Sequence, residues 1–354
     1  MRWWTNQQKQ RLIQKSREDS PKVLYVDTIS DWEAQSNVHG MMKAYGRVST
    51  LEAFDYRWLA RYYGQRLMNQ MLIQAAQWYQ PDLVHLGKAE SVSGNAIKEI
   101  KESTESCVIH FYGDFRWETK PHVVAIGKYA DCTLLYHKDE TIIQNYRDRG
   151  VRQVGFWWVG TDPEVFYPRP REKRYDVIFM ANNADFLKGH QKRRDLIEAI
   201  IAKDINLDLF GRGWDYLSDI ENAHLHPFVN DEEFAQACSG AKITLGFNAV
   251  NDVRMYASWR RPLNSMASGA FHLTRYFPGL EDVFENGKHL VWFHSIPEAI
   301  DQIEYYLAHD REREKIASAG RQEVLMHHTW DDRIADMLDY MEQAKNSKNA
   351  KYAQ

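Results

Sequence analysis

The sequence predicts an α/β protein in two similar halves, each an open parallel sheet with helices on both faces. Short apolar runs alternate with longer amphipathic stretches along the chain, which is the pattern of parallel strands connected by helices. A proline-rich break at 160–170 divides this series into two. The length of 354 residues also corresponds to about two domains.

In the first half, short apolar runs bounded by turn residues predict strands, and apolar residues at helical spacing predict helices. Ser36 is the expected N-cap of the first helix. The predicted strands are Lys22–Asp27, Pro81–Gly87, Cys107–Gly113, Cys132–Tyr136 and Val154–Val159. The predicted helices are Ser36–Tyr45, Leu59–Tyr79, Ser93–Glu102 and Glu140–Arg149.

The break Gly160–Pro170 holds three prolines and is followed by the charged Arg171–Arg174, so we expect a linker here. After it the alternation of strands and helices begins again. The predicted strands of the second half are Tyr175–Met180, Leu207–Phe210, Ala241–Leu245, Phe271–Thr274 and His289–Phe293. Its predicted helices are Arg193–Ala202, Asp231–Ser239, Pro262–Ser268 and Ile296–Ala308.

The chain ends with two predicted helices. The first is Arg311–His327, and the second begins after Thr329, its expected N-cap. Asp331 and Asp332 stand in the first turn of this second helix, where carboxylates favour the helix dipole. An apolar stripe at positions i, i+3, i+4 and i+7 predicts that the helix packs on a surface. The stripe is Ile334, Met337, Leu338 and Met341.

Composition excludes several classes of protein. Hydrophobic residues make up 44% and aromatic residues 13%, which is enough for two cores and excludes a disordered or fibrous chain. The net charge of −4 gives no global basic field for nucleic acid or an anionic membrane. The three cysteines, Cys107, Cys132 and Cys238, form no CxxC pair, so we expect no disulfide framework and a reducing, cytoplasmic setting.

Neither a targeting signal nor a transmembrane segment is predicted. The longest uncharged run, Leu67–Pro81, is too short and too polar to span a bilayer. The N-terminal extension carries Trp3 and Trp4 beside several basic residues. It either lies on a membrane surface or packs on the body as an amphipathic extension, and we favour packing.

Six segments in order carry a resemblance to a known family. They are Gly160–Pro168, Leu209–Trp214, His226–Ala235 with Ala241–Leu245, Arg261–Gly269, Gly279–Glu281 and Thr329–Trp330. Together they resemble the GT-B nucleotide-sugar glycosyltransferases, in particular the CgeB-like group of family-1-type transferases. The resemblance covers residues 22 to about 341.

The resemblance implies two Rossmann-like domains with a cleft between them. Residues 1–168 would form an acceptor domain, with the terminal helix 329–344 crossing back to pack on it, and residues 169–328 would form the donor domain. The implied activity moves a sugar from a nucleoside-diphosphate sugar, such as a UDP-sugar or GDP-sugar, to a hydroxyl of a carbohydrate or other acceptor. No cofactor is implied, since the nucleotide-sugar is a co-substrate.

The resemblance also implies the donor-binding residues. A Lys-Gly pair, here Lys188-Gly189, meets the diphosphate, and Arg261 begins a helix from which its guanidinium can fork onto phosphate oxygens. Asn264 stands where family members hold a glutamate that binds the ribose. The further donor candidates are Arg194, the glycines Gly211 and Gly213 that allow close backbone approach, Val229 in the loop that meets the base, and Glu281.

The acceptor side is predicted from polar residues that follow the first-half strands. An inverting transferase needs a general base near the acceptor hydroxyl, and our candidates are Asp114, Glu90 and His39, in that order. The chain contains no Asp-x-Asp, which argues against the metal-dependent GT-A class, so we expect no metal. The other strand-end polar residues are Asp27, Asp31, Lys88 and His110, of which His110 is expected to be a core histidine.

Two alternatives stay open. One is a related enzyme on the same scaffold, such as an epimerase or a phosphorylase. The other is a nucleotide-sugar binding or scaffold protein, because Asn182, Tyr256 and Asn264 replace charged residues that the wider superfamily uses. Since the two glutamates of retaining members are here Tyr256 and Asn264, the stereochemistry is left undetermined.

Overall fold

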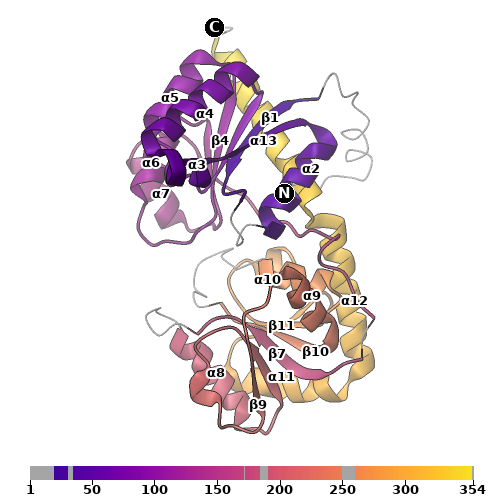
Figure 1. Ribbon diagram of the computed structural model, residues 1–354. Coiled ribbons are helices and arrows are strands. Elements are labelled where there is room, and N and C mark those ends of the chain that lie inside the picture. Colours follow the sequence, from indigo (N-terminus) through magenta and orange to yellow (C-terminus); the bar gives the residue numbers. More distant parts are fainter. Residues whose placement is uncertain (1–19, 31–34, 171, 184–189, 249–259, 353–354) are drawn as a thin grey trace. The chain divides into compact units, whose positions relative to one another are not determined.

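The computed structural model describes residues 20–30, 35–170, 172–183, 190–248 and 260–352 (Figure 1). The chain divides into two compact units, one ending at Gly160 and resuming at Trp330, the other formed by Thr161–Thr329. Each unit contains a six-stranded sheet in which every strand pair is parallel. The predicted α/β fold with two open parallel sheets is therefore confirmed.

The sheet of the first unit has the strand order β2-β1-β3-β4-β5-β6. Its second strand was not predicted, because β2 is a half-exposed edge strand without an apolar run. In a parallel sheet all carboxyl ends lie at one edge, which is where ligands bind in α/β proteins. The strands are β1 (Lys22–Asp27), β2 (Thr50–Asp55), β3 (Leu83–Gly87), β4 (Cys107–Tyr112), β5 (Cys132–Leu135) and β6 (Val154–Phe156).

Two helices of the first unit differ from their predictions. The earlier one begins at Gln35, so Ser36, its expected N-cap, lies within it. The single helix expected at Leu59–Tyr79 is two helices, because Gly64 has φ +81° and ends the first of them. That first helix starts at Tyr56, where the side chain of Asp55 accepts a hydrogen bond from the backbone of Trp58. The helices are α2 (Gln35–Val48), α3 (Tyr56–Tyr63), α4 (Gln65–Tyr79), α5 (Gly94–Ser103), the unpredicted α6 (Pro121–Gly127) and α7 (Glu140–Asp148).

The last helix, α13 (Trp330–Tyr352), belongs to the first unit, as predicted. Figure 1 shows it running alongside the first sheet. The indole of Trp157 donates to the carbonyl of Arg333, and the hydroxyl of Tyr340 donates to the carbonyl of Phe156. The predicted apolar stripe of this helix is buried, as the i, i+3, i+4, i+7 spacing requires.

The sheet of the second unit has the order β12-β11-β10-β7-β8-β9. The edge strand β9 was not predicted, because two of its four residues are histidines and it therefore has no apolar run. The strands are β7 (Tyr175–Met180), β8 (Leu207–Phe210), β9 (Ala223–His226), β10 (Ala241–Gly246), β11 (His272–Arg275) and β12 (Val291–Phe293). The helices are α8 (His190–Ile201), α9 (Asp231–Gly240), α10 (Arg260–Ala267), α11 (Ile296–Ala308), α12 (Asp310–His327) and the 3-10 turns η3 (Asp215–Leu217) and η4 (Leu280–Asp282).

Among the described residues, no helix is long and apolar enough to cross a bilayer.

Candidate functional site

A cavity of about 230 Å³ lies in the second unit, at the carboxyl edge of its sheet. Met180 and Phe210, which end β7 and β8, form part of its wall. The first residues of α9 and α10 form another part, so two helix N-termini border the cavity. The full lining is Met180, Ala181, Asn182, Phe210, Phe228, Val229, Asp231, Phe234, Arg261 and Asn264. A site of this kind suits an anionic ligand.

Arg261 supplies the cationic side chain of this cavity, from the first turn of α10. The nearby His272 is fully buried on β11, where its Nδ1 lies 3.1 Å from the hydroxyl of Thr244. Burial and, to a smaller extent, the charge of Arg261 together lower the pKa of His272 to about 3. His272 is therefore neutral at physiological pH, so among the described residues that line the cavity the positive charge comes from Arg261.

Asn264 is buried one turn further along α10 and also lines the cavity. The hydroxyl of Thr161 donates to its Oδ1 at 2.8 Å. Asn264 also carries an amide nitrogen, which can donate a hydrogen bond to a ligand. The side chain therefore offers a hydrogen-bond donor where the family pattern has a carboxylate acceptor.

Val229 lies in a loop whose shape is fixed by the start of α9. Asn230 caps this helix by accepting from the backbone of Glu233, and the Glu233 carboxylate accepts in return from the backbone of Asn230. This capping box holds Phe228 and Val229 at the cavity wall. Asp231 also lines the cavity. From the sequence it was expected only as the first residue of a helix.

Local packing and backbone conformation require glycine at both Gly211 and Gly213. A Cβ at Gly213 would lie 2.1 Å from the carbonyl oxygen of Asn183, and one at Gly211 would lie 2.7 Å from that of Ala181. Both glycines also have positive φ, of +84° and +133°. They let the loop after β8 press against the segment after β7, which forms one wall of the cavity.

Two further donor candidates in the described part of the chain, Arg194 and Glu281, are not among the residues that line this cavity. Arg194 donates to the side chains of Asn183 and Gln191. Glu281 is exposed in η4, where its carboxylate accepts from the backbone of Gly279. Lys188, like Tyr256, lies outside the described residues. Of the predicted donor residues, the structure brings together Val229, Arg261 and Asn264.

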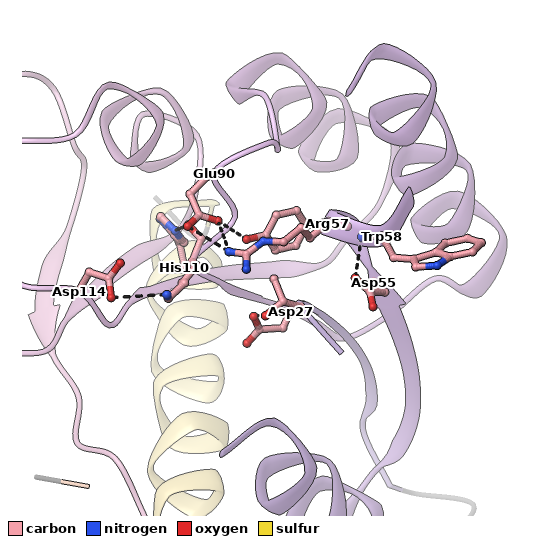
Figure 2. A network of polar contacts seen from close by, with 10 residues as sticks. Asp27, Asp55, Arg57, Trp58, Glu90, His110 and Asp114 are labelled. Atoms are coloured by element: carbon pink, nitrogen blue, oxygen red, sulfur yellow. Dashed lines mark hydrogen bonds and ion pairs between the residues drawn. The ribbon is translucent and has the colours of Figure 1, made fainter. Parts of the chain in front are cut away.

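A second group of polar side chains lies at the carboxyl edge of the first sheet (Figure 2). We call it the strand-end cluster, and it consists of Asp27, Asp55, Glu90, His110 and Asp114. Asp27 and Asp55 end the paired strands β1 and β2, and Glu90 and Asp114 follow β3 and β4. The parallel arrangement of the strands therefore brings together residues that are far apart in sequence.

Glu90 is held by two side chains of α3. The hydroxyl of Tyr56 donates to its Oε2, and the guanidinium of Arg57 lies 3.2 and 3.3 Å from the two carboxylate oxygens (Figure 2). Burial acts to raise the pKa of Glu90, but the bonds from Tyr56 and Arg57 outweigh it and the pKa lies below its usual value. This carboxylate is therefore a weak base.

Asp114 is engaged less tightly than Glu90, which accepts hydrogen bonds from Tyr56 and Arg57. It pairs with Lys88 at 3.6 Å, and both side chains are about one-third exposed, at 34% and 39% (Figure 2). The loop that carries Lys88 is strained, because Lys88 and Ala89 have φ of 40° and 60° although neither is glycine. Such strain costs on the order of 1–3 kcal/mol per residue and is concentrated at functional sites.

His110 supports this strained loop. Its Nε2 lies 3.1 Å from the carbonyl oxygen of Lys88 and must donate, since a carbonyl only accepts. Burial lowers the pKa of His110 to about 4, so the ring is neutral and its tautomer is fixed by this bond. The expectation of a core histidine agrees with its full burial.

Asp27 is the most deeply buried carboxylate of the cluster. Tyr25 and the backbone of Thr28 donate to it at 2.6 and 2.7 Å, and a Cβ at Gly87 would collide with its Oδ2. Burial raises the pKa of Asp27, although these hydrogen bonds act in the opposite direction. His39, the third predicted base, is exposed on α2.

Over the described residues, no group of three or more His, Cys, Asp or Glu side chains could hold a metal ion. The expectation that no metal is needed stays a prediction.

Residues 191–339 match the protein-family model described as glycosyl transferase-like. No curated protein matches the chain.

Solved structures share its fold over nearly the whole length. HepE from Anabaena, solved with UDP and glucose, is 13% identical with a TM-score of 0.63, covering 90% of this chain and 100% of that one. Sucrose-phosphate synthase from Thermosynechococcus elongatus is 13% identical with a TM-score of 0.64, covering 92% and 100%. A glycosyltransferase from Rickettsia africae is 12% identical with a TM-score of 0.65, covering 92% and 99%.

Proposed function

We propose that this chain, which has the GT-B fold and matches a glycosyl transferase-like family model over residues 191–339, moves a sugar from a nucleoside-diphosphate sugar to an acceptor hydroxyl. The observation that carries the proposal is the cavity of the second unit, where Arg261 and two helix N-termini meet at a sheet edge. A diphosphate needs this combination of a fixed cation and backbone N–H donors. HepE was solved with UDP, which supports a uridine nucleotide as the first to test.

In this proposal the guanidinium of Arg261 and the start of α10 bind the diphosphate. The capped loop at Val229 meets the base, and the amide of Asn264 donates to a ribose oxygen. Lys188, Arg194 and Glu281 stay predicted donor residues, with Gly211 and Gly213 shaping the wall.

Charge must be compensated when the bond between the sugar and the diphosphate breaks. The electron pair of that bond goes to the diphosphate, and we propose that Arg261 and the helix dipoles stabilise it without a metal. Preorganised groups of this kind need no rearrangement as the charge develops.

The acceptor is proposed to bind at the strand-end cluster. In an inverting transfer, Asp114 takes the proton of the acceptor hydroxyl while its oxygen forms the new bond to the anomeric carbon. Its partial exposure and loose ion pair with Lys88 support this role. Glu90, the second candidate, is weakened as a base by Tyr56 and Arg57, and His39 is the third.

A second candidate function is a nucleotide-sugar binding or scaffold protein. The amides of Asn182 and Asn264, which replace charged residues, favour it, because both have structural partners. Asn182 accepts through Oδ1 from the backbone of Arg212, and Asn264 accepts from Thr161.

The test is to incubate the purified chain with UDP-sugars and GDP-sugars in the presence of a chelator and to measure the nucleoside diphosphate released. Release above the uncatalysed rate, lost in Arg261→Ala, supports the transferase. Tight nucleotide binding without release, across a panel of sugars and acceptors, supports the scaffold protein instead.

A further inference from the structure

Two consecutive helices of the first unit present large apolar side chains to solvent. We call these residues the aromatic face: Trp58, Tyr62 and Tyr63 on α3, and Leu67 and Trp78 on α4. Trp78 is the most exposed, at 82%. Leu67 and Trp78 are separated by about three helical turns, so they lie on the same side of α4. The opposite side of α4 packs into the core through Met68, Leu72 and Ala76.

The three rings of α3 gather around Trp58. The centroid of Trp58 lies 4.7 Å from that of Tyr62 and 6.1 Å from that of Tyr63. Figure 2 shows the indole of Trp58 extending away from Glu90 and Asp114. Exposed rings that cluster in this way indicate an interaction surface, whereas apolar side chains scattered singly over a surface need no such explanation.

The charge of the same segment is opposite to that of the protein. From Tyr56 to Tyr79 the sequence contains no Asp or Glu, but it contains Arg57, Arg61 and Arg66. The whole chain has a net charge of −4. Arg57 contacts Glu90, whereas Arg61 and Arg66 have exposed side chains beside the aromatic face. The surface therefore combines local positive charge with exposed aromatic rings.

This combination fits the surface of an anionic lipid bilayer. Trp and Tyr have an apolar body and a polar tip, and both are enriched where membrane meets water. Arginines beside them reach anionic headgroups while their stems cover apolar surface. Helices of this composition lie in the interface with their apolar side toward the acyl chains.

We propose that α3 and α4 bind the first unit to an anionic bilayer through the aromatic face, with Arg61 and Arg66 contacting the lipid headgroups. The side chain of Asp55 caps α3, and Arg57 contacts Glu90, so the bound bilayer lies next to the strand-end cluster. The proposal does not depend on sugar transfer, and it can hold or fail independently of it.

The test is co-sedimentation of the full chain with vesicles of phosphatidylcholine, with and without phosphatidylglycerol. We expect binding only when phosphatidylglycerol is present, and weaker binding at high salt. The variant Arg61→Gln/Arg66→Gln should bind at least about tenfold more weakly. The variant Trp58→Ser/Tyr62→Ser should lose most of the binding, with an unchanged melting temperature because both side chains are exposed.

Matched variants in the same unit control for charge and for exposed aromatics. Arg147→Gln/Arg152→Gln removes two exposed charges elsewhere, and Trp117→Ser removes a ring that is 60% exposed. Both should bind vesicles like the unmodified chain. The proposal is overturned if the chain does not bind these vesicles or if Trp58→Ser/Tyr62→Ser binds them unchanged. It is also overturned if Trp58→Ser/Tyr62→Ser converts a dimer into a monomer without changing vesicle binding. The partner of the aromatic face would then be a second copy of the chain.

Discussion

The hydroxyl of Thr161 donates a 2.8 Å hydrogen bond to Oδ1 of Asn264, and both side chains are buried. Thr161 precedes the second sheet and Asn264 lies on α10, so the bond ties the entry of the second unit to the wall of its cavity. It restrains the orientation of the Asn264 amide at the cavity wall. We expect Thr161→Val to destabilise the protein by about 1 kcal/mol and to lower nucleotide affinity severalfold.

A control for this substitution is Thr133→Val in the first unit. The hydroxyl of Thr133 is buried, and within the described structure it has no hydrogen-bond partner. Its replacement should leave stability nearly unchanged, as measured by urea unfolding. Equal losses for the two variants would contradict a specific role for the bond between Thr161 and Asn264.

Arg261→Ala should weaken the binding of UDP or GDP by about ten- to a hundredfold, because charge-assisted hydrogen bonds to a diphosphate are lost. Calorimetric titration of the full chain measures this. Arg311→Ala, on the exposed start of α12, is the control for lost charge and should bind like the unmodified chain. Unchanged affinity in Arg261→Ala would remove Arg261 from the donor site.

Gly213→Ala should destabilise the second unit far more than Gly287→Ala. Both glycines have positive φ, of +84° and +75°, so each substitution carries the conformational cost of about 1 kcal/mol. At Gly287 a Cβ meets nothing within 4 Å, whereas at Gly213 it collides with the carbonyl of Asn183. Chemical denaturation gives the free energy of unfolding of both variants. Because both carry the conformational cost and only Gly213→Ala carries the collision, the difference between them measures the collision. Similar values would show that the two loops do not press together.

Asp114→Asn should lower kcat strongly, by about a hundredfold or more, with little change in donor affinity, because the proton acceptor is lost and the donor site is elsewhere. Glu90→Gln is the matched comparison, with a smaller loss of kcat, since Tyr56 and Arg57 already engage that carboxylate. A larger effect in Glu90→Gln than in Asp114→Asn would reverse the assignment.

Acidification should destabilise the protein through its buried histidines. Burial lowers the pKa of His85 to about 3 and that of His110 to about 4, against about 6.5 in the unfolded chain. The unfolded state then binds more protons below pH 6.5, so stability is full above that pH and falls as the pH decreases toward 4. Each such histidine adds up to about 1.4 kcal/mol per pH unit to the slope.

Urea unfolding between pH 7 and 4.5 measures this slope. His85→Phe, in a pocket formed with Tyr25, Tyr45 and Trp157, should reduce it. The exposed His224→Asn serves as the control and should not. An unchanged slope in His85→Phe would show that this ring is not kept neutral by burial.

The sequence predicts the buried strands well because their apolar runs are continuous. The bounds of β1, β7 and β8 match the predictions. The edge strand β2 was missed because its exposed residues give no such signal, and the kink at Gly64 was missed because a glycine inside a helical pattern is often tolerated. Local pattern therefore predicts the interior of each sheet better than its edges.

In the candidate sites too, the sequence predicts residues that follow buried strands better than residues that depend on an edge strand. Val229, Arg261 and Asn264 gather because parallel strands place the loops after them at one edge, a rule that the sequence can use. The contacts of Tyr56 and Arg57 with Glu90 could not be predicted, since they depend on the missed strand β2, which places α3 beside the loop after β3. Asp231 was expected only as the first residue of a helix, so its place in the cavity lining was missed.

The location of the bound nucleotide tests the account most directly. Hydrogen–deuterium exchange of the full chain with and without saturating UDP or GDP reports which backbone amides the ligand protects. We expect protection at residues 228–233 and in the first turns of α10, within the second unit. Binding of a nucleoside diphosphate that leaves these amides unprotected, or no binding of either nucleotide, would contradict the central claim.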